Sequence, residues 1–138
     1  MQGRRAFFTL SVIFCLLARA CALARAETPV DNSLKNPFAG NAEAITFGKA
    51  IFEATCAGYC HATEGAKRGG RCPNLFDCEW KHGGSDGEVF HTVTEGVPKT
   101  EMVGFKGKLP DDVLWKIIAY LRSASQCQNG KPAAEAAH

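Results

Sequence analysis

Two cysteines and a histidine stand close together in this 138-residue chain, in the segment Cys56-Ala57-Gly58-Tyr59-Cys60-His61. Two thiols that flank a short turn can add to the vinyl groups of a haem, and the histidine that follows is placed to bind the iron. The usual attachment pattern is C-x-x-C-H, whereas this segment reads C-x-x-x-C-H. We interpret it as a haem attachment site. We expect the extra residue to distort the turn without preventing either thioether, with Gly58 absorbing the bulge through backbone conformations closed to other residues.

The same residues allow two other interpretations. Cys56 and Cys60 are close enough in sequence to form a disulfide, with His61 incidental. Alternatively, these three residues and either Cys72 or Cys78 could supply the four ligands of a zinc site.

The second candidate ligand is a methionine. Met102 is the only methionine other than Met1, and it follows His61 by forty-one residues in a segment that contains glycine. A thioether bound to iron opposite His61 would complete a His/Met pair, which raises the haem reduction potential. Without a haem, Met102 would be an ordinary loop methionine, and His82 and His91 are the rival sixth ligands.

A first helix must deliver the cysteines. Apolar residues recur with an approximate 3.6-residue period from Asn41 or Ala42 to the Cys56 region, which predicts that helix. A short second helix is predicted over Asp86–Glu95, with Gly96 ending it.

The strongest apolar stripe predicts a last helix near Val113, capped by Asp111 or Asp112. The stripe contains Leu114, Ile117, Ile118 and Leu121. No segment alternates as a strand would, so the chain is predicted to be all-α, with three to four helices. Long loops inside so small a domain favour a cofactor that organises them.

The first 26 residues have the layout of a secretory signal peptide. Two arginines precede the apolar run 6–17, and small residues follow up to Ala26, after which we expect cleavage. The apolar run has about a dozen residues, short of the ~20 that a membrane anchor needs. A lipoprotein site at Cys21 is disfavoured by Arg19. We therefore expect an exported, periplasmic protein without stable membrane insertion.

Loss of this leader changes the charge of the chain. Four of the sixteen basic residues leave and all fourteen acidic residues stay, so the net charge changes from +2 to −2, twelve basic against fourteen acidic. No run of basic residues interleaved with aromatic residues remains, which excludes the usual footprint of nucleic-acid binding.

These residues together give the chain a resemblance to class I mono-haem c-type cytochromes, over residues 48–123. Gly48, Phe52 and Tyr120 match the positions where the first and last helices of that family cross. Pro73, twelve residues after His61, matches the family proline whose carbonyl orients the histidine, and Met102 matches the distal ligand. The resemblance implies a cytochrome c fold around one covalent haem c. It divides the chain into the signal peptide (1–26), an extended arm (27–40), a cytochrome c domain (41–126) and a flexible tail (127–138).

The resemblance also implies a function and partners. A haem with both axial positions filled by protein suits an electron carrier and not an enzyme. A similarity to cytochromes that serve pyrroloquinoline-quinone alcohol dehydrogenases, including methanol dehydrogenases, lies in residues 73–75, 80, 83–86, 88–90 and 95–96, and residues 36–40 add to it. Related stretches also occur in oxidase-associated cytochromes. The implied donor is such a quinoprotein, and the acceptor is an oxidase or a second cytochrome; we expect a monomer. The alternatives are a ligand-binding or peroxidase-like haem protein and a haem subunit of a larger dehydrogenase.

Once the leader with Cys15 and Cys21 is removed, three cysteines outside the attachment segment remain, and their pairing stays open. Cys72 and Cys78 could staple the loop under His61, or Cys127 could pair with either of them or with another chain. Six basic residues fall in loops expected near the haem edge and could steer an acidic partner. They are Lys67, Arg68, Arg71, Lys99, Lys106 and Lys108.

Overall fold

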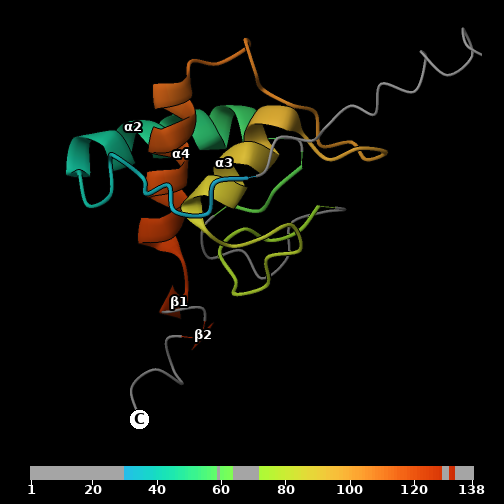
Figure 1. Cartoon of the computed structure of the whole chain (residues 1–138). Helices are drawn as coiled ribbons and strands as arrows, with labels where there is room; N and C mark the ends of the chain where they lie inside the picture. Colours follow the sequence, from blue (N-terminus) through green and yellow to red (C-terminus); the bar gives the residue numbers. More distant parts are fainter. Residues whose placement is uncertain (1–29, 59, 64–71, 129–130, 133–138) are drawn as a thin grey trace, which may run out of the picture.

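The computed structural model describes residues 30–58, 60–63, 72–128 and 131–132 (Figure 1). Within these ranges the chain forms α2 (Ala42–Phe52), a π-helical turn η1 (Glu53–Ala57), α3 (Asp86–Glu95) and α4 (Asp111–Ala124). Two strands of two residues each, β1 (Cys127–Gln128) and β2 (Lys131–Pro132), pair antiparallel after α4. The all-α prediction is confirmed. The expected signal peptide lies outside the described residues.

Helix α2 crosses α4, as Figure 1 shows, and the two helices pack against each other. Gly48 makes this approach possible, because a Cβ there would overlap the backbone carbonyl of Lys116 on α4. Asn41 begins α2, its side chain accepting a hydrogen bond from the amide of Ala44 (2.9 Å). The predicted crossing of the first and last helices at Gly48 is therefore confirmed.

The hydrophobic core lies next to this crossing. Phe52, Phe76 and Tyr120 pack with ring centroids 5.6–5.7 Å apart, and each is almost completely buried. All four residues of the predicted α4 stripe are buried beside or near them. Such tilted and edge-to-face aromatic pairs add to the free energy that burial supplies. Packing in the core fixes the position of Phe52, the last residue of α2, which precedes the attachment segment in the sequence.

Helix α4 begins one residue earlier than the capping prediction allows. Pro110 occupies the N-cap position, where no side-chain hydrogen bond is made, and Asp111 and Asp112 lie inside the first turn. Their capping role was therefore wrong. Carboxylates in a first turn still interact favourably with the positive end of the helix dipole.

The segment before α2 runs along α3 and α4 in Figure 1. Its anchor is Asn36, which is buried; its Nδ2 donates to the Trp115 carbonyl (2.9 Å) and its amide donates to Asp86 Oδ2 (3.0 Å). These bonds join the arm to the N-terminal end of α3 and to the middle of α4. No helix among the described residues is both long enough and apolar enough to cross a membrane.

Candidate functional site

A cavity of about 410 Å³ lies between the loop after η1, the segment 72–83, α3, the loop before α4 and α4 itself. It is lined by four of the five predicted site residues, namely Cys60, His61, Pro73 and Met102. The fifth, Cys56, is half-buried and packs against the core cluster. The structure thus brings together residues that are up to 42 positions apart in the sequence.

The walls of the cavity are mostly apolar. They are formed by Leu75, Val89, Val93, Val97, Ile117, Ile118 and Leu121. Helices α3 and α4 supply most of these side chains, so their apolar faces serve both the core and the cavity. The volume lies within the ~300–1,000 Å³ that is typical of cofactor and small-molecule sites.

His61 is held in one orientation by Pro73. Its Nδ1 lies 2.9 Å from the Pro73 carbonyl oxygen. A carbonyl can only accept a hydrogen bond, so Nδ1 must carry the proton and donate it. The lone pair of the neutral ring is then on Nε2, the nitrogen left available to bind a metal. Such a backbone acceptor fixes the tautomer and orientation of a metal-binding histidine.

Met102 reaches the cavity from a loop that is fastened to the end of α3. The Val97 amide donates to the Met102 carbonyl (2.9 Å), and the Met102 amide donates to Thr100 Oγ1 (3.1 Å). Gly96 ends α3 with φ +79°, and a Cβ on it would crowd the Gly104 amide at 2.5 Å. Glycine is therefore required at this turn, and the turn sets the path of the methionine loop.

Cys56 and Cys60 both carry thiols, so they do not form the disulfide considered from the sequence. Burial, with a smaller contribution from the neighbouring Cys60, raises the pKa of the Cys56 thiol to about 11. No cluster of three or more potential metal ligands exists among the described histidine, cysteine and acidic residues. The zinc alternative therefore has no support in this part of the chain.

Gly58 does not play the role predicted for it. Its φ of −60° and ψ of −25° are ordinary right-handed helical values, which any residue can adopt. The expectation that its special freedom absorbs the extra residue was wrong. The distortion lies instead in the helix itself. The π-helical turn η1, which contains the first cysteine, follows α2 in place of a further α-helical turn.

Comparison with known proteins gives the family. A family model described as "Cytochrome C oxidase, cbb3-type, subunit III" matches residues 43–121, more than half of the chain. The chain belongs to this cytochrome c family. The cbb3-type cytochrome c oxidase subunits FixP of Sinorhizobium medicae (strain WSM419) and Rhizobium meliloti (strain 1021) are each 32% identical to it over 91 residues, 60% of this chain. The match spans only 31% of each FixP protein.

Two solved structures share the fold of this cytochrome. Cytochrome cL from the marine methylotrophic bacterium Methylophaga aminisulfidivorans MPT superposes with a TM-score of 0.59 and 26% identity, covering 72% of this chain and 70% of that one. Cytochrome cL from Hyphomicrobium denitrificans gives 0.60 and 26%, covering 72% and 60%. The protein is a class I mono-haem cytochrome c, and its cofactor is a covalently bound c-type haem.

The cytochrome offers residues that fit this haem. An apolar cavity suits the macrocycle, and it is lined by Cys60, which follows the half-buried Cys56 by four residues. His61 presents an imidazole whose Nδ1 is already occupied by Pro73. Met102 adds a thioether from a separate loop. Cysteine, histidine and methionine are the attachment and axial residues that c-type haems use.

Of the rival ligands, His82 lines the haem cavity and is exposed, whereas His91 lies outside the cavity lining. Two further residues at the cavity were not singled out as site residues by the sequence. Cys72 lines it beside Pro73, and Trp80 lines it while its ring lies under the Arg122 guanidinium, 4.9 Å from the centroid. Neither contact has a sequence signature, because both depend on how the segment 72–83 folds back.

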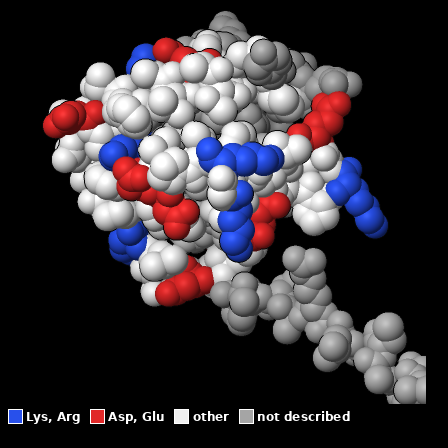
Figure 2. Space-filling view, turned by 90° about the horizontal axis from the view of Figure 1, so that it is seen from above, with Lys and Arg blue, Asp and Glu red and all other residues white. Residues whose placement is uncertain are grey.

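The basic residues expected near the haem edge do not form one described patch. Lys67, Arg68 and Arg71 lie outside the described residues. Lys106 Nζ pairs with Glu95 Oε1 at 2.8 Å, and exposed pairs of this kind contribute little to stability. Figure 2 shows basic and acidic side chains interspersed on the face that it presents.

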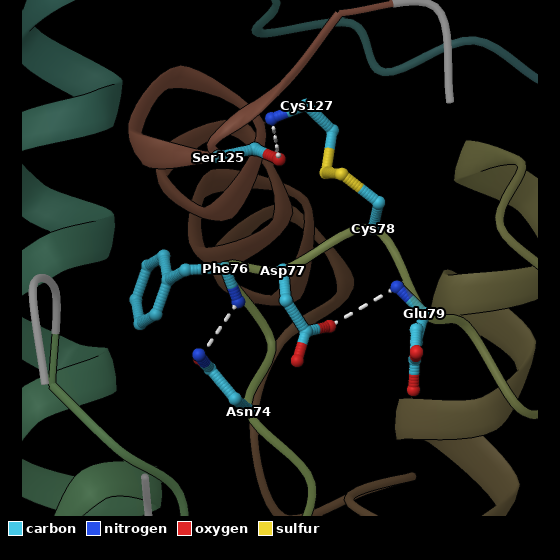
Figure 3. Close-up of a disulfide and its surroundings, with 7 residues drawn as sticks. All are labelled: Asn74, Phe76, Asp77, Cys78, Glu79, Ser125 and Cys127. Atoms are coloured by element: carbon cyan, nitrogen blue, oxygen red, sulfur yellow. Dashed lines mark hydrogen bonds between the residues drawn. A yellow bond between two sulfur atoms is a disulfide. The ribbon is translucent and has the colours of Figure 1, made fainter. Parts of the chain in front are cut away.

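The cysteine pairing that the sequence left open is Cys78 with Cys127 (Figure 3). The bond joins the segment behind the haem cavity to the residue that begins β1, where the flexible tail was predicted to start. Two hydrogen bonds accompany it: Cys127 donates its amide to Ser125 Oγ (3.2 Å), and Gln126 donates its amide to the Phe76 carbonyl (2.9 Å). The end of α4 is therefore tied to the wall of the site.

Proposed function

We propose that this cytochrome carries single electrons. Cys56 and Cys60 would form the thioethers, and His61, through Nε2, and Met102 would hold the iron. The haem provides a one-electron iron couple. The chain's own residues attach it, orient its ligands and enclose it in an apolar cavity.

The observation that carries the proposal is the bond from His61 Nδ1 to the Pro73 carbonyl at the edge of the cavity that Met102 also lines. An imidazole held in this way is preset as a metal ligand. Met102, from a second and independently fastened loop, would supply the other protein ligand. With both ligands supplied by protein, the iron would have no vacant site for substrate.

Carbon monoxide tests this assignment, because it binds reduced haem iron only where an axial position is open. We expect the reduced protein at neutral pH to bind it slowly and incompletely. Rapid and complete binding would reject the carrier function in favour of a ligand-binding or peroxidase-like protein in which Met102 dissociates easily.

For the donor, we propose a quinoprotein alcohol dehydrogenase, such as a methanol dehydrogenase. The similarity of residues 73–75, 80, 83–86, 88–90 and 95–96 to cytochromes of such systems supports this donor. Further support is that the two solved structures reported above are cytochromes cL, one of them from a methylotroph. We propose a terminal oxidase or a second cytochrome as acceptor, and the periplasm, reached through the signal peptide, as the location.

Reduction kinetics test the donor. Purified oxidised cytochrome mixed with a quinoprotein dehydrogenase and alcohol should be reduced at physiological ionic strength, and the rate should fall without alcohol. An unchanged oxidised spectrum in the complete mixture would count against this donor while leaving the carrier function intact.

A second candidate function is that of a haem module within a larger redox complex. The FixP relatives favour it, since they are named as oxidase subunits and are about three times as long as the matched region. Size-exclusion chromatography of the native extract distinguishes the two functions. A diffusible carrier elutes at the size of a small monomer, and a complex subunit elutes with its partners.

A further inference from the structure

The attachment segment of this cytochrome is one residue longer than the usual pattern, and the structure shows where the additional length goes. Helix α2 continues directly into η1, in which the hydrogen bonds are of the π type. The His61 amide then donates to the Cys56 carbonyl at 3.1 Å, a bond that spans five residues. The Cys60 amide approaches the same carbonyl at 3.3 Å.

A bond spanning five residues holds one residue more than the four-residue bond of an α-helix. In a C-x-x-C-H segment the histidine is four residues after the first cysteine; here it is five residues after it. The His61 amide nevertheless remains bonded to the carbonyl of that cysteine. His61 therefore stays one turn beyond Cys56, although the turn contains an additional residue.

Both ends of this segment are fixed by contacts that do not involve the extra residue. Upstream, Phe52 is 1% exposed in the aromatic core, and Gly48 lies against the α4 backbone. Downstream, Pro73 holds the His61 ring. An additional residue in a regular α-helix would rotate everything after it by about 100°. The widening must therefore occur between Phe52 and His61.

Gly58 is not what makes the widening possible. It has right-handed helical angles, and a Cβ placed on it would meet nothing closer than the Ala54 and Glu53 carbonyl oxygens, both at 3.7 Å. These are ordinary van der Waals distances. The accommodation is a property of the hydrogen-bond pattern and requires no special residue at this position.

We propose that the extra residue between Cys56 and Cys60 is absorbed as a single-residue π-type widening at the end of α2. This widening keeps both thiols and His61 in the relative positions that double attachment requires. Each thioether forms when a cysteine S–H adds across a vinyl double bond, sulfur to one carbon and the proton to the other, without net oxidation. The inference rests on the proposed roles of Cys56, Cys60 and His61.

Deletion of Ala57 tests the inference, because it removes one residue from the widened turn and restores C-x-x-C-H. We expect the variant to mature with two thioethers, scored by the pyridine haemochrome spectrum and by intact mass. The matched control deletes Ala50, an exposed alanine in the regular part of α2. This second deletion should lose holoprotein, since it rotates Phe52 out of the core relative to Gly48.

Gly58→Ala provides a variant that changes no spacing. It should retain both thioethers and the parent spectrum. The inference is overturned if the Ala57 deletion fails to accumulate as holoprotein or carries a single thioether, or if Gly58→Ala loses a thioether.

Cys56→Ser and Cys60→Ser separate this inference from the proposed attachment. Each should leave one thioether. If either variant still carries two, with Cys72 as the replacement, the attachment proposal itself fails. If each carries one and the Ala57 deletion does not mature, only the π-type accommodation fails.

Discussion

The proposed axial residues His61 and Met102 are held by different means. His61 is oriented by one hydrogen bond to a backbone carbonyl, whereas Met102 is placed by a loop whose backbone is bonded to the end of α3. The Met102 side chain is half-buried, and its neighbour Val103 is 55% exposed. The proposed proximal ligand is thus held through its side chain, and the proposed distal ligand through the backbone of its loop.

Met102→Ala tests the distal assignment. Loss of the thioether should open the sixth position, so the reduced variant should bind carbon monoxide rapidly. Its reduction potential should fall by a fraction of the roughly 0.8 V over which axial ligands tune haem. Potentiometric titration and stopped-flow mixing with carbon monoxide measure the two effects.

Val103→Ala is the control for this substitution, because it shortens an exposed side chain in the same loop. It should leave both the potential and the carbon monoxide kinetics unchanged. If Met102→Ala behaves like Val103→Ala, the distal ligand is another residue, and His82 at the cavity is the first to examine.

At this scale the sequence offers candidate site residues wherever a side chain could carry the chemistry. Cys56, Cys60, His61 and Met102 could be proposed from residue type and spacing. Pro73 entered only through a family resemblance, because its contribution is a backbone oxygen that every residue possesses. The pairing of Cys78 with Cys127 could not be predicted, since it depends on where the end of α4 meets the segment 72–83.

At the scale of the elements, the backbones of α2 and α4 approach so closely at their crossing that no side chain fits at position 48. Gly48→Ala should destabilise the protein, because its Cβ would overlap the Lys116 carbonyl on a neighbouring helix whose backbone cannot move independently. Overpacking of this kind costs roughly 1–3 kcal/mol, and sometimes more. Chemical denaturation followed by circular dichroism measures the change in unfolding free energy.

Ala50→Ser provides the comparison, since Ala50 is two residues further along α2 and exposed. Its effect should remain within about 0.5 kcal/mol, the usual range for surface substitutions. Equal stability of Gly48→Ala and Ala50→Ser would show that the helices can separate at the crossing.

Helix α3 begins with a capping box that makes its stability depend on pH. Ser85 donates its amide to Glu88 (2.9 Å) and accepts from the Glu88 amide (3.2 Å). The Ser85 amide, then its hydroxyl, hold the pKa of the Glu88 carboxyl below its ordinary value. Because this pKa is lowered, the ionised Glu88 contributes its full stabilisation above the unfolded-state pKa of about 4.3. That stabilisation is lost as the pH falls through the folded-state pKa of Glu88.

Glu88→Gln should therefore reduce the free energy of unfolding at neutral pH, and the difference from the parent should shrink below about pH 4. Denaturation curves at a series of pH values measure this difference. The matched substitution, Glu43→Gln, is in the first turn of α2, where Asn41 provides the cap. A difference at position 88 that stays constant from pH 7 to strongly acidic conditions would contradict the assignment.

Helix positions were predictable because burial imposes a period on the sequence, and the bounds of α3 agree with the prediction. The ends were less predictable. Pro110 occupies the N-cap of α4 in place of the aspartates, with extended backbone angles (φ −62°, ψ 148°) that its ring allows. The π-type turn was not predicted, because apolar periodicity does not show whether an amide bonds to the carbonyl four or five residues before it.

On the scale of the whole molecule, three ties connect the N-terminal arm, the cavity segment and α4. Asn36 joins the arm to α4, and Arg122 joins α4 to Asp86 (2.9 Å) and to the Gly84 carbonyl while it covers Trp80. The disulfide is the third tie, and it closes a loop that contains α3, Met102 and α4. A large part of the cavity wall is therefore enclosed by one covalent loop.

Removal of this loop closure gives the last prediction. Cys78 and Cys127 are separated by 49 residues, and in the chain-entropy treatment a closed loop of that length contributes about 4 kcal/mol. The double variant Cys78→Ser/Cys127→Ser should lose up to that amount of unfolding free energy, yet mature with both thioethers, because neither cysteine belongs to the attachment segment. A strong dithiol reductant should lower the parent to the stability of the double variant and leave the variant itself unaffected. Ascorbate reduces haem iron but not disulfides, so it separates the effect of the disulfide from that of the iron's oxidation state. If parent and double variant are equally stable in ascorbate, the loop is held by the haem and the helix packing alone.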